Sequence, residues 1–296
     1  MNYSTTNSIK ACDIVRITEQ INSGIHSRSL RRIAIGYILS GTKYIHSNDI
    51  CHQINAGDIF LLNPGIHYEE NNIERDGQFK QITFYLSPES LQQVIFSLNI
   101  NYGLTFSSRH SCRHCSTYNF AIAEGSTMLR NFFTSIDLSL RNNGLLHNDV
   151  GQRIKLNELI YLIMVSEDNC IRQKLLRSTD VTTSHFINTI YENIFNDISI
   201  DTLATLTNRS LTSFKKEFKR LFNSSPHHWI ITQRLDRAKI MLSSTNLTVS
   251  EVGAECGFAN ISHFIKLFKQ RYQNTPANFR RLLHLTERPL RAAVGE

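Results

Sequence analysis

The C-terminal third of the chain carries one helical pattern twice, and this repeat constrains the fold more than any other feature. The second copy runs from Thr248 to Arg280, TVSEVGAECGFANISHFIKLFKQRYQNTPANFR. Thr248 and Glu251 predict a capping box that starts a short helix. Gly257 ends that helix, because a residue without Cβ readily takes the left-handed conformation, and Asn260 predicts the cap of the next helix. Helix, tight turn and second helix is the layout of a helix-turn-helix, whose second helix enters the major groove of DNA.

The first copy lies upstream and follows the same plan. Ser199 caps a short helix, Asn208 with the next residue makes the turn, and Ser210 caps a second helix. Each copy ends at a proline, Pro226 or Pro276, which fits the first turn of a following helix. In both copies the second helix has an apolar face at helical spacing: Phe214, Phe218, Leu221 and Phe222 in the first, and Phe264, Leu267, Phe268 and Tyr272 in the second.

Four motifs with fixed spacing extend over this repeat. They are RLDRAKIML (Arg234–Leu242), VSEVGAECGF (Val249–Phe258), SHFIKLFK (Ser262–Lys269) and TPANFR (Thr275–Arg280). They resemble the DNA-binding domain of the AraC/XylS family of bacterial transcription regulators, and the resemblance covers about Ser184 to Leu283. It implies two helix-turn-helix units that read adjacent major-groove segments, joined by a rigid helix. The helical pattern from Trp229 to Ser243 is the expected joining helix.

The charge distribution supports a nucleic-acid partner independently. The whole chain has 32 basic and 25 acidic residues, a net charge of +7. From Ile200 onward there are 15 basic and 7 acidic residues, so the remainder carries a net charge of −1. The excess positive charge therefore lies on the part expected to bind DNA, as a phosphate-binding surface requires, although a solvated basic surface has the same signature.

Outward positions near the start of each second helix are the predicted base contacts, because the N-terminal turns of a recognition helix reach base edges. They are Thr212, Lys215 and Lys216 in the first unit, and Ile261, Ser262, Ile265 and Lys266 in the second. Isoleucine packs on thymine methyl groups, serine bonds several bases, and lysine reaches guanine or phosphate. Lys219, Arg220 and Lys269 are predicted to hold phosphates. The first unit's helix start offers little base-reading chemistry, so we expect that unit mainly to clamp phosphates; the alternative for each residue is an ordinary exposed side chain.

The N-terminal part has the pattern of short strands at roughly ten-residue spacing, which is typical of a small sandwich or barrel. The predicted strands are Ile33–Leu39, Lys43–His46, Ile50–Asn55, Ile59–Leu62 and Phe79–Leu86. The stretch AGDIFLLNPGIH, Ala56 to His67, resembles the cupin-like effector domain that precedes many AraC-type DNA-binding domains. The resemblance implies a cupin-like β-barrel with flanking helices, followed by an all-α domain of two helix-turn-helix units.

Beyond Ser90 the apolar rhythm becomes helical. The helical stretches are Leu91–Leu98, Ala123–Leu140 and Val150–Val165. We therefore predict a cupin-like effector domain at 1–110, a helical dimerisation or packing segment at 111–170, a linker at 171–183, the DNA-binding domain at 184–285 and a disordered tail at 286–296. In the family, helices at this place pack against the barrel and often form the dimer interface. The resemblance also implies RNA polymerase as a partner.

Residues Tyr37, Phe60, Leu62, Phe84 and His67 are the candidate lining of an effector pocket inside the barrel. Alternation along the strands is the support for this set, and core packing is the competing role for each member. The resulting hypothesis is a sequence-specific transcription regulator controlled by a small molecule, with control by a partner protein as the alternative. No enzymatic activity and no cofactor are expected, because a cupin metalloenzyme uses an H-x-H pair and the chain contains none.

One cluster, HSCRHC from His110 to Cys115, suggests different chemistry. Cys112 and Cys115 form a C-x-x-C pair with two nearby histidines, a pattern that fits zinc binding or a redox switch. A structural zinc site needs four ligands, and there is no second C-x-x-C pair, so an ordinary polar loop is the competing interpretation.

The chain has no apolar run long enough to cross a membrane, and its polar N-terminus does not resemble a signal peptide. We therefore expect a cytoplasmic protein whose six cysteines are reduced.

Overall fold

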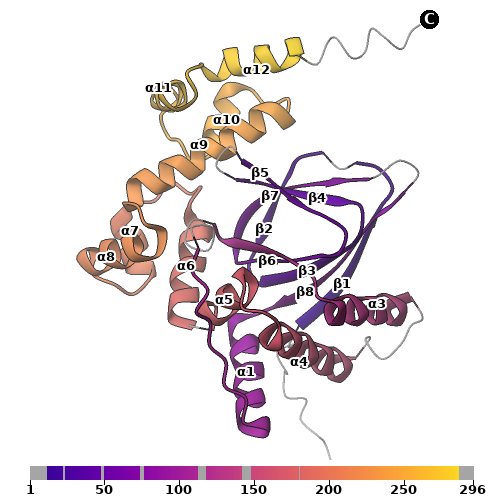
Figure 1. Cartoon of the computed structure of the whole chain (residues 1–296). Coiled ribbons are helices and arrows are strands. Elements are labelled where there is room, and N and C mark those ends of the chain that lie inside the picture. Colours follow the sequence, from indigo (N-terminus) through magenta and orange to yellow (C-terminus); the bar gives the residue numbers. More distant parts are fainter. Residues whose placement is uncertain are drawn as a thin grey trace, which may run out of the picture. The chain divides into compact units, whose positions relative to one another are not determined.

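The computed structural model describes residues 12–22, 24–47, 50–73, 77–112, 118–141, 148–179 and 181–286. The chain divides into two compact units, Met1–Asn188 and Thr189–Glu296. Figure 1 shows strands and helices in the first unit and helices in the second. The predicted order, an antiparallel β domain with flanking helices followed by an all-α domain, is confirmed.

Two antiparallel sheets form the centre of the first unit. The five-stranded sheet has the order β1 (Cys12–Glu19), β8 (Phe79–Leu86), β3 (Ile33–Ser40), β6 (Asp58–Leu62) and β9 (Phe120–Glu124). The four-stranded sheet has the order β2 (His26–Leu30), β7 (Gly65–Asn72), β4 (Thr42–Ser47) and β5 (Ile50–Ile54). Between the described strands the hydrogen-bonded ladders form two separate sheets rather than one closed barrel.

The turn at Gly57 carries the chain from one sheet to the other. The sequence predicts strand, turn and strand here, and both strands form, but β5 pairs with β4 whereas β6 pairs with β3 and β9. Gly57 has φ +99°, and its N–H donates to the Ile38 carbonyl oxygen at 2.9 Å. A positive φ at this corner requires glycine, and the corner gives the domain its two layers.

Strand β9 corrects the predicted helix from Ala123 to Leu140. The chain completes the sheet through Glu124 and becomes helical only in α3 (Thr127–Arg141). The Gly125 N–H donates to the Gly57 carbonyl oxygen at 3.0 Å, which holds the strand end at the sheet edge. Periodicity alone does not separate a short buried strand from the first turns of a helix, and this is the reason for the error.

Helices α1 (Pro88–Tyr102), α3, α4 (Asp149–Val165) and α5 (Cys170–Arg177) belong to the first unit. The expected linker at 171–183 differs from the structure, because α5 occupies most of it and α6 (Val181–Asn193) begins before its end. Ile171 and Leu175 of α5 are buried in the core, which explains why a polar stretch is ordered. Ile171 and Leu175 lie at i and i+4, so both face the core from one side of this short helix.

Each face of the five-stranded sheet covers its own core. Ile35, Ile59, Ile82 and Phe84 pack on residues of α1, α3, α4 and α5, whereas Ala34, Ile38, Phe60 and Leu62 pack toward the four-stranded sheet. Because successive side chains of a strand point to opposite faces, one strand contributes to both cores.

The second unit follows the predicted repeat. Its helices are α7 (Ile200–Leu206), α8 (Leu211–Phe222), α9 (Pro226–Ser244), α10 (Val249–Glu255), α11 (Ile261–Tyr272) and α12 (Pro276–Thr286). Helices α7 and α8 form the first helix-turn-helix, α10 and α11 form the second, and α9 joins them. The predicted disordered tail begins inside the last turn of α12, and residues 287–296 lie outside the described chain.

Candidate nucleic-acid interface

The second helix-turn-helix unit is fixed by its caps and its turn. The Thr248 side chain accepts from the Glu251 N–H at 3.2 Å, and the Glu251 carboxylate accepts from the Thr248 N–H at 2.7 Å, which is the predicted capping box. Gly257 has φ +81° and ends α10, and Asn260 Oδ1 accepts from the His263 N–H at 3.0 Å to start α11. These contacts satisfy helix-end N–H groups that would otherwise lack partners.

Two glycines let the elements of this unit approach closely. A Cβ on Gly253 would lie 2.9 Å from Ile261 Cδ1 and 3.0 Å from Phe264 Cδ1, so α11 rests on the bare backbone of α10. A Cβ on Gly257 would lie 2.6 Å from the Phe195 carbonyl oxygen. A glycine inside a helix lowers its intrinsic stability, and the close packing of α11 is what Gly253 permits in return.

The first unit repeats this geometry with different residues. Asn208 adopts φ +56° at the turn, and the Arg209 N–H donates to the Ala204 carbonyl oxygen at 2.9 Å. In the second unit the equivalent bond runs from the Phe258 N–H to the Gly253 carbonyl oxygen at 3.0 Å. The two turns therefore share one backbone conformation.

Helix α9 holds both units through side-chain contacts. Arg234 donates three hydrogen bonds of 2.7 Å, to the carbonyl oxygens of Ile194, Asn196 and Gly257. Burial lowers the pKa of the Arg234 guanidinium. Three of its five N–H donors are used inside the C-terminal unit, so Arg234 fixes α9 to the segment before α7 and to the turn at Gly257.

Further contacts bind α9 to the two second helices. Asp236 accepts from Arg271 at 2.8 Å and from the Tyr272 hydroxyl at 2.6 Å, which connects α9 to α11. Trp229 packs on Phe222 of α8 with ring centroids 4.4 Å apart. Both recognition helices are thus fixed to one rigid element, as recognition of two adjacent groove segments requires.

The structure leaves most of the predicted DNA contacts exposed. The exposed ones are Thr212, Lys215, Lys216, Lys219, Arg220, Ser262, Lys266 and Lys269. Within the described chain Lys215, Lys216, Lys219, Lys266 and Lys269 are in no ion pair, whereas Arg220 contacts Glu217 at 2.7 Å. Lysines without a partner carboxylate are available to phosphates at no cost in broken contacts.

Ile261 and Ile265 are only partly exposed. Ile261 lies against Gly253, and Ile265 packs on the core formed by Phe264 and its neighbours. Sequence reasoning missed His263, which is exposed on the first turn of α11. Its spacing from Lys266 and Gln270, at i, i+3 and i+7, places these three residues on one exposed face, and that spacing was the available signal.

The predicted effector-pocket residues lie in two different cores. Tyr37 stacks on Phe133 at 4.6 Å between ring centroids, and Phe84 packs on the same ring from 6.0 Å. Phe60 and Leu62 lie on the opposite face of the sheet, toward the four-stranded sheet. The sequence prediction places these residues on one pocket wall. In the structure both faces of the five-stranded sheet are buried, and Tyr37 and Phe84 lie on one face while Phe60 and Leu62 lie on the other.

His67 is buried, and its Nε2 donates to the Asn63 carbonyl oxygen at 2.8 Å. Burial lowers the pKa of the His67 ring. Close by on the same sheet, buried Lys43 donates to Glu69 at 2.6 Å and to Asn71 at 3.0 Å. Burial alone would raise the pKa of Glu69, but Lys43 and Arg28 lower it below its usual value, so this carboxylate stays ionised.

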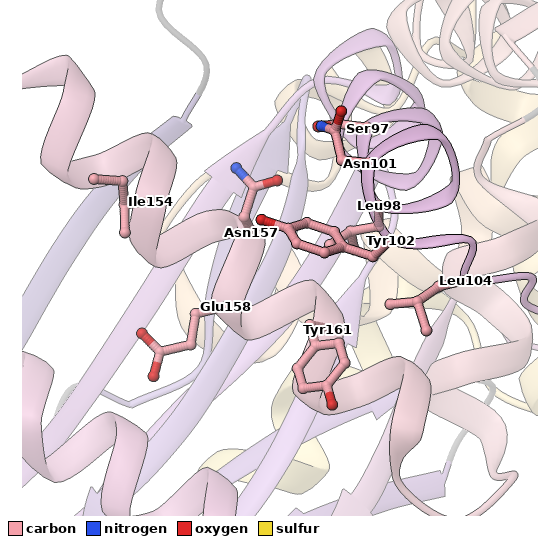
Figure 2. Close-up of a pocket in the computed structure, with 9 residues that line it drawn as sticks. All are labelled: Ser97, Leu98, Asn101, Tyr102, Leu104, Ile154, Asn157, Glu158 and Tyr161. Atoms are coloured by element: carbon pink, nitrogen blue, oxygen red, sulfur yellow. The ribbon is translucent and has the colours of Figure 1, made fainter.

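A groove of about 660 Å³ opens between α1 and α4 (Figure 2). It is lined by Ser97, Leu98, Asn101, Tyr102, Leu104, Ile154, Asn157, Glu158 and Tyr161. None of the predicted pocket residues lies here, because helix surfaces carry no strand alternation to point to them.

Within the described residues, His46, His52 and His67 belong to no group of side chains that could hold a metal ion. His46 Nε2 lies 3.1 Å from Glu70 Oε2, while the His52 ring packs edge-on against Tyr118 and Phe120. Cys115 and His114 lie outside the described residues. Cys112 lies instead beside Cys170, with the two sulfurs 3.5 Å apart.

The match to known domain families covers both units. Residues 203–282 match the family "Helix-turn-helix domain", and residues 34–171 match the family "ExsA N-terminal regulatory domain". The chain therefore combines an AraC-type helix-turn-helix domain with an N-terminal regulatory domain of the ExsA type. No described helix is both long and apolar enough to span a membrane.

Similar proteins are also named as helix-turn-helix transcriptional regulators or share this two-domain fold. An uncharacterized HTH-type transcriptional regulator of Staphylococcus aureus (strain COL) is 21% identical over 258 residues, which is 86% of this chain and 32% of that protein. The chain thus spans about a third of the length of the first curated relatives it matches. An uncharacterized HTH-type regulator from the cgkA 5′ region of Pseudoalteromonas carrageenovora is 38% identical over 92 residues, 31% of this chain and 54% of that protein. Apo ToxT, as a variant from Vibrio cholerae, shares the fold with a TM-score of 0.50 and 10% identity, covering 92% of this chain and 98% of that chain.

Proposed function

We propose that this chain, an AraC-type helix-turn-helix regulator with an N-terminal regulatory domain, controls transcription by binding promoter DNA through α8 and α11. The observation that carries the proposal is the pair of capped recognition helices, each fixed to α9 and each exposing lysines that are in no ion pair with the part of the chain that the structure describes. Such a protein acts where the chromosome is, which supports a cytoplasmic location. Contact with RNA polymerase at the promoter is part of the proposal.

DNA binding is tested by fluorescence anisotropy of the full chain with duplex DNA over a range of salt. Each phosphate contact contributes about 0.9 to the slope of log affinity against log salt. Replacing Lys219 and Lys269, the predicted phosphate contacts that are in no ion pair within the described chain, by alanine should therefore lower that slope by up to about 2. Arg31 and Lys80, which lie in the N-terminal unit with the two sheets, are the control pair, and their replacement by alanine should leave the slope unchanged. A full chain that folds but binds DNA without salt dependence would refute the proposed function.

A homodimer is proposed from an apolar surface on α1 and α4. Phe96 and Ile100 on α1 are 65% and 64% exposed, and Val150 and Ile154 on α4 are 69% and 60% exposed. Four large apolar side chains this exposed are typical of an interaction surface. A second copy is the occupant we propose, because two linked DNA-binding domains gain affinity for adjacent sites without any new contact.

Sedimentation velocity tests the dimer. Phe96→Glu and Ile154→Glu should each weaken self-association at least about 10-fold, because a carboxylate would have to be buried in the interface. Met128→Glu on α3, at a side chain that is 66% exposed, is the control and should leave the dimer intact. Loss of the dimer in the control alone would move the interface to α3.

We also propose that a small molecule acts on the first unit through the groove between α1 and α4. Its volume is in the usual range for ligand sites, and its apolar walls carry a few polar groups, among them Asn101, Asn157 and Glu158. A ligand here would contact both helices of the proposed dimer surface, and it shifts a balance between two arrangements only by its differential affinity for them.

Deletion of the first unit should keep specific DNA recognition and abolish the response to the inducing compound. A partner protein that docks on α1 and α4 is the competing regulator. Thermal shift of the full chain with a panel of compounds distinguishes a small molecule from a partner protein. A compound that binds the groove should raise the melting temperature of the full chain, and Tyr161→Ala should remove that rise. If promoter activity changes when a protein is added but not when any compound of the panel is added, the partner protein is favoured as the regulator.

A further inference from the structure

His110, Cys112 and Cys170 form a cluster that neither the DNA-binding proposal nor the matched families assign. His110 Nε2 lies 3.2 Å from Cys170 Sγ, and Cys112 Sγ lies 3.5 Å from Cys170 Sγ. The three ligand atoms all lie within 4.8 Å of one another, and the side chains are half-buried. All three belong to the first unit, so the cluster is defined within one compact body.

These separations fit a tetrahedral metal ion. Zinc with Zn–S bonds of about 2.3 Å and a Zn–N bond of about 2.0–2.1 Å holds two sulfurs roughly 3.8 Å apart, and sulfur and nitrogen roughly 3.6 Å apart. The sulfur–sulfur distance here is well beyond a disulfide bond of about 2.05 Å. Two thiolates and a neutral imidazole together balance the charge of a divalent ion.

The surrounding hydrogen bonds hold the ligands in place independently of a metal. Asp168 accepts from the Ser108 hydroxyl at 2.5 Å and from the backbone N–H groups of Arg109 and His110 at 2.7 and 3.0 Å. Gln173 of α5 donates to the His110 carbonyl oxygen. The loop that carries His110 and Cys112 is therefore pinned against the start of α5, where Cys170 lies.

Cys170 is the first residue of α5, and the preceding Asn169 accepts from the N–H groups of Ile171 and Arg172. The side chain of Asn169 thus caps this helix end, and the Cys170 sulfur at the same end lies beside His110 Nε2 and the Cys112 sulfur. The partial positive charge of a helix N-terminus also favours a thiolate there.

From this geometry we propose that His110, Cys112 and Cys170 bind one zinc-class divalent ion, with a water or an exogenous ligand in the fourth position. The ion joins the segment after α1 to α5, which packs on β6 and β9 through Ile171 and Leu175. It therefore stabilises the first unit, and the proposal is independent of whether the chain binds DNA. Because two thiols must lose their protons, ion binding weakens as the pH falls.

Cobalt(II) titration of the reduced full chain tests the site. We expect one ion per chain, the visible bands of tetrahedral cobalt, a thiolate charge-transfer band in the near ultraviolet, and displacement by zinc. Cys112→Ser, Cys170→Ser and His110→Ala should each weaken binding by more than the roughly 10–100-fold that loss of an outer-shell partner costs. Cys51→Ser, at an exposed thiol on β5, is the matched control and should bind cobalt as the unaltered chain does.

Three results would overturn the assignment. The first is a reduced chain that takes up no cobalt at micromolar concentration. The second is unchanged binding in Cys170→Ser, which would place any metal on another set of ligands. The third is a Cys112–Cys170 disulfide, found by peptide mass spectrometry, in a protein that binds no metal after reduction. Circular dichroism controls for folding, and if Cys170→Ser is unfolded, the two loop variants decide the question.

Discussion

The two helix-turn-helix units reach the same backbone conformation with different residues. The first uses Ala204 inside α7 and Asn208 at the turn, and the second uses Gly253 inside α10 and Gly257 at the turn. Asn208 tolerates a positive φ at some cost, whereas glycine has no such cost. The second unit therefore gives up helix propensity in α10 and gains an approach of α11 that a side chain would block.

The surfaces of the two recognition helices differ as well. Helix α8 exposes Lys215, Lys216 and Lys219, while α11 exposes Ser262, His263 and Lys266. Lysines orient a protein on the phosphate backbone, and a mixed set of donors and acceptors reads base edges. The comparison leads to a hypothesis: the tightly packed second unit specifies the sequence, and the first clamps the DNA.

The largest effect is expected from Gly257→Ala. The new Cβ would lie 2.6 Å from the Phe195 carbonyl oxygen, at φ +81°, beside the guanidinium of Arg234. Backbone strain and overpacking together should lower the free energy of unfolding of the C-terminal unit, Thr189–Glu296, by about 3 kcal/mol. Urea unfolding followed by the fluorescence of Trp229, the single tryptophan, measures the unfolding of this C-terminal unit.

Asn208→Gly in the first unit is the matched control. Its turn has the same handedness and already contains a tolerated residue, so the substitution should change the free energy of unfolding by about 1 kcal/mol or less. Equal losses from the two substitutions would mean that the turns are under the same constraint, contrary to the comparison.

The second prediction separates specificity from affinity. Lys266→Ala should weaken binding to a selected operator by about 1–3 kcal/mol and relax discrimination at one position. Lys219→Ala should weaken operator and random DNA about equally and lower the salt slope by about 1. Competition anisotropy with both DNAs measures the two quantities. If the two variants behave alike, the division of labour between α8 and α11 fails while DNA binding stands.

A third prediction exchanges the small residues of the two first helices. Gly253→Ala gains about 1 kcal/mol of helix propensity but brings a Cβ within 3.0 Å of Phe264, and overpacking costs about 1–3 kcal/mol, so a net loss of about 1 kcal/mol is expected. Ala204→Gly should cost about 1 kcal/mol because propensity is lost with nothing gained in packing. If Gly253→Ala instead raises the free energy of unfolding, measured with the same Trp229 fluorescence, α11 shifts to accommodate the new Cβ at little cost.

Local signals were enough to predict the C-terminal compact unit, Thr189–Glu296, which holds both helix-turn-helix units. The caps at Ser210, Thr248 and Asn260 and the turn at Gly257 are set by residues a few positions apart, and the structure has them as predicted. For the N-terminal unit, Met1–Asn188, the same reasoning predicted less. Both faces of the five-stranded sheet are buried, so alternation gave two sets of residues and no means to tell which set faced a cavity.

Long-range pairs were beyond the sequence pattern. Cys112 was considered with Cys115, three residues away, but its partner in the structure is Cys170, 58 residues along the chain. The packing of α5 against β6 and β9, together with the hydrogen bonds of Asp168 and Gln173 with the loop, brings that thiol to Cys112. Strand β9 was missed for a related reason, since its partner β6 lies far upstream and a five-residue apolar run has no distinct period.

The smallest effect concerns the capping box, which the second unit has and the first lacks. Hydrogen bonds from Thr248 lower the pKa of the Glu251 carboxyl, because the ionised form accepts the Thr248 N–H at 2.7 Å. In the first unit the equivalent of Glu251 is Thr202, whose hydroxyl lies 2.9 Å from the Ser199 hydroxyl and carries no charge.

A depressed folded-state pKa means that the Glu251 contribution is present above the unfolded pKa, about 4.3, and is lost as the pH falls through the folded value. Glu251→Gln keeps an acceptor without the charge, so it should lower the urea midpoint at pH 7 and match the unaltered chain in acid. Thr202→Glu should raise the midpoint at pH 7 only, since it adds the missing half of the box to the first unit. Each shift should be smaller than those of Gly257→Ala, Gly253→Ala and Ala204→Gly because both sites are exposed. A gap between Glu251→Gln and the unaltered chain that persists unchanged in acid would show that geometry rather than charge makes this cap, and the two units would then differ in packing alone.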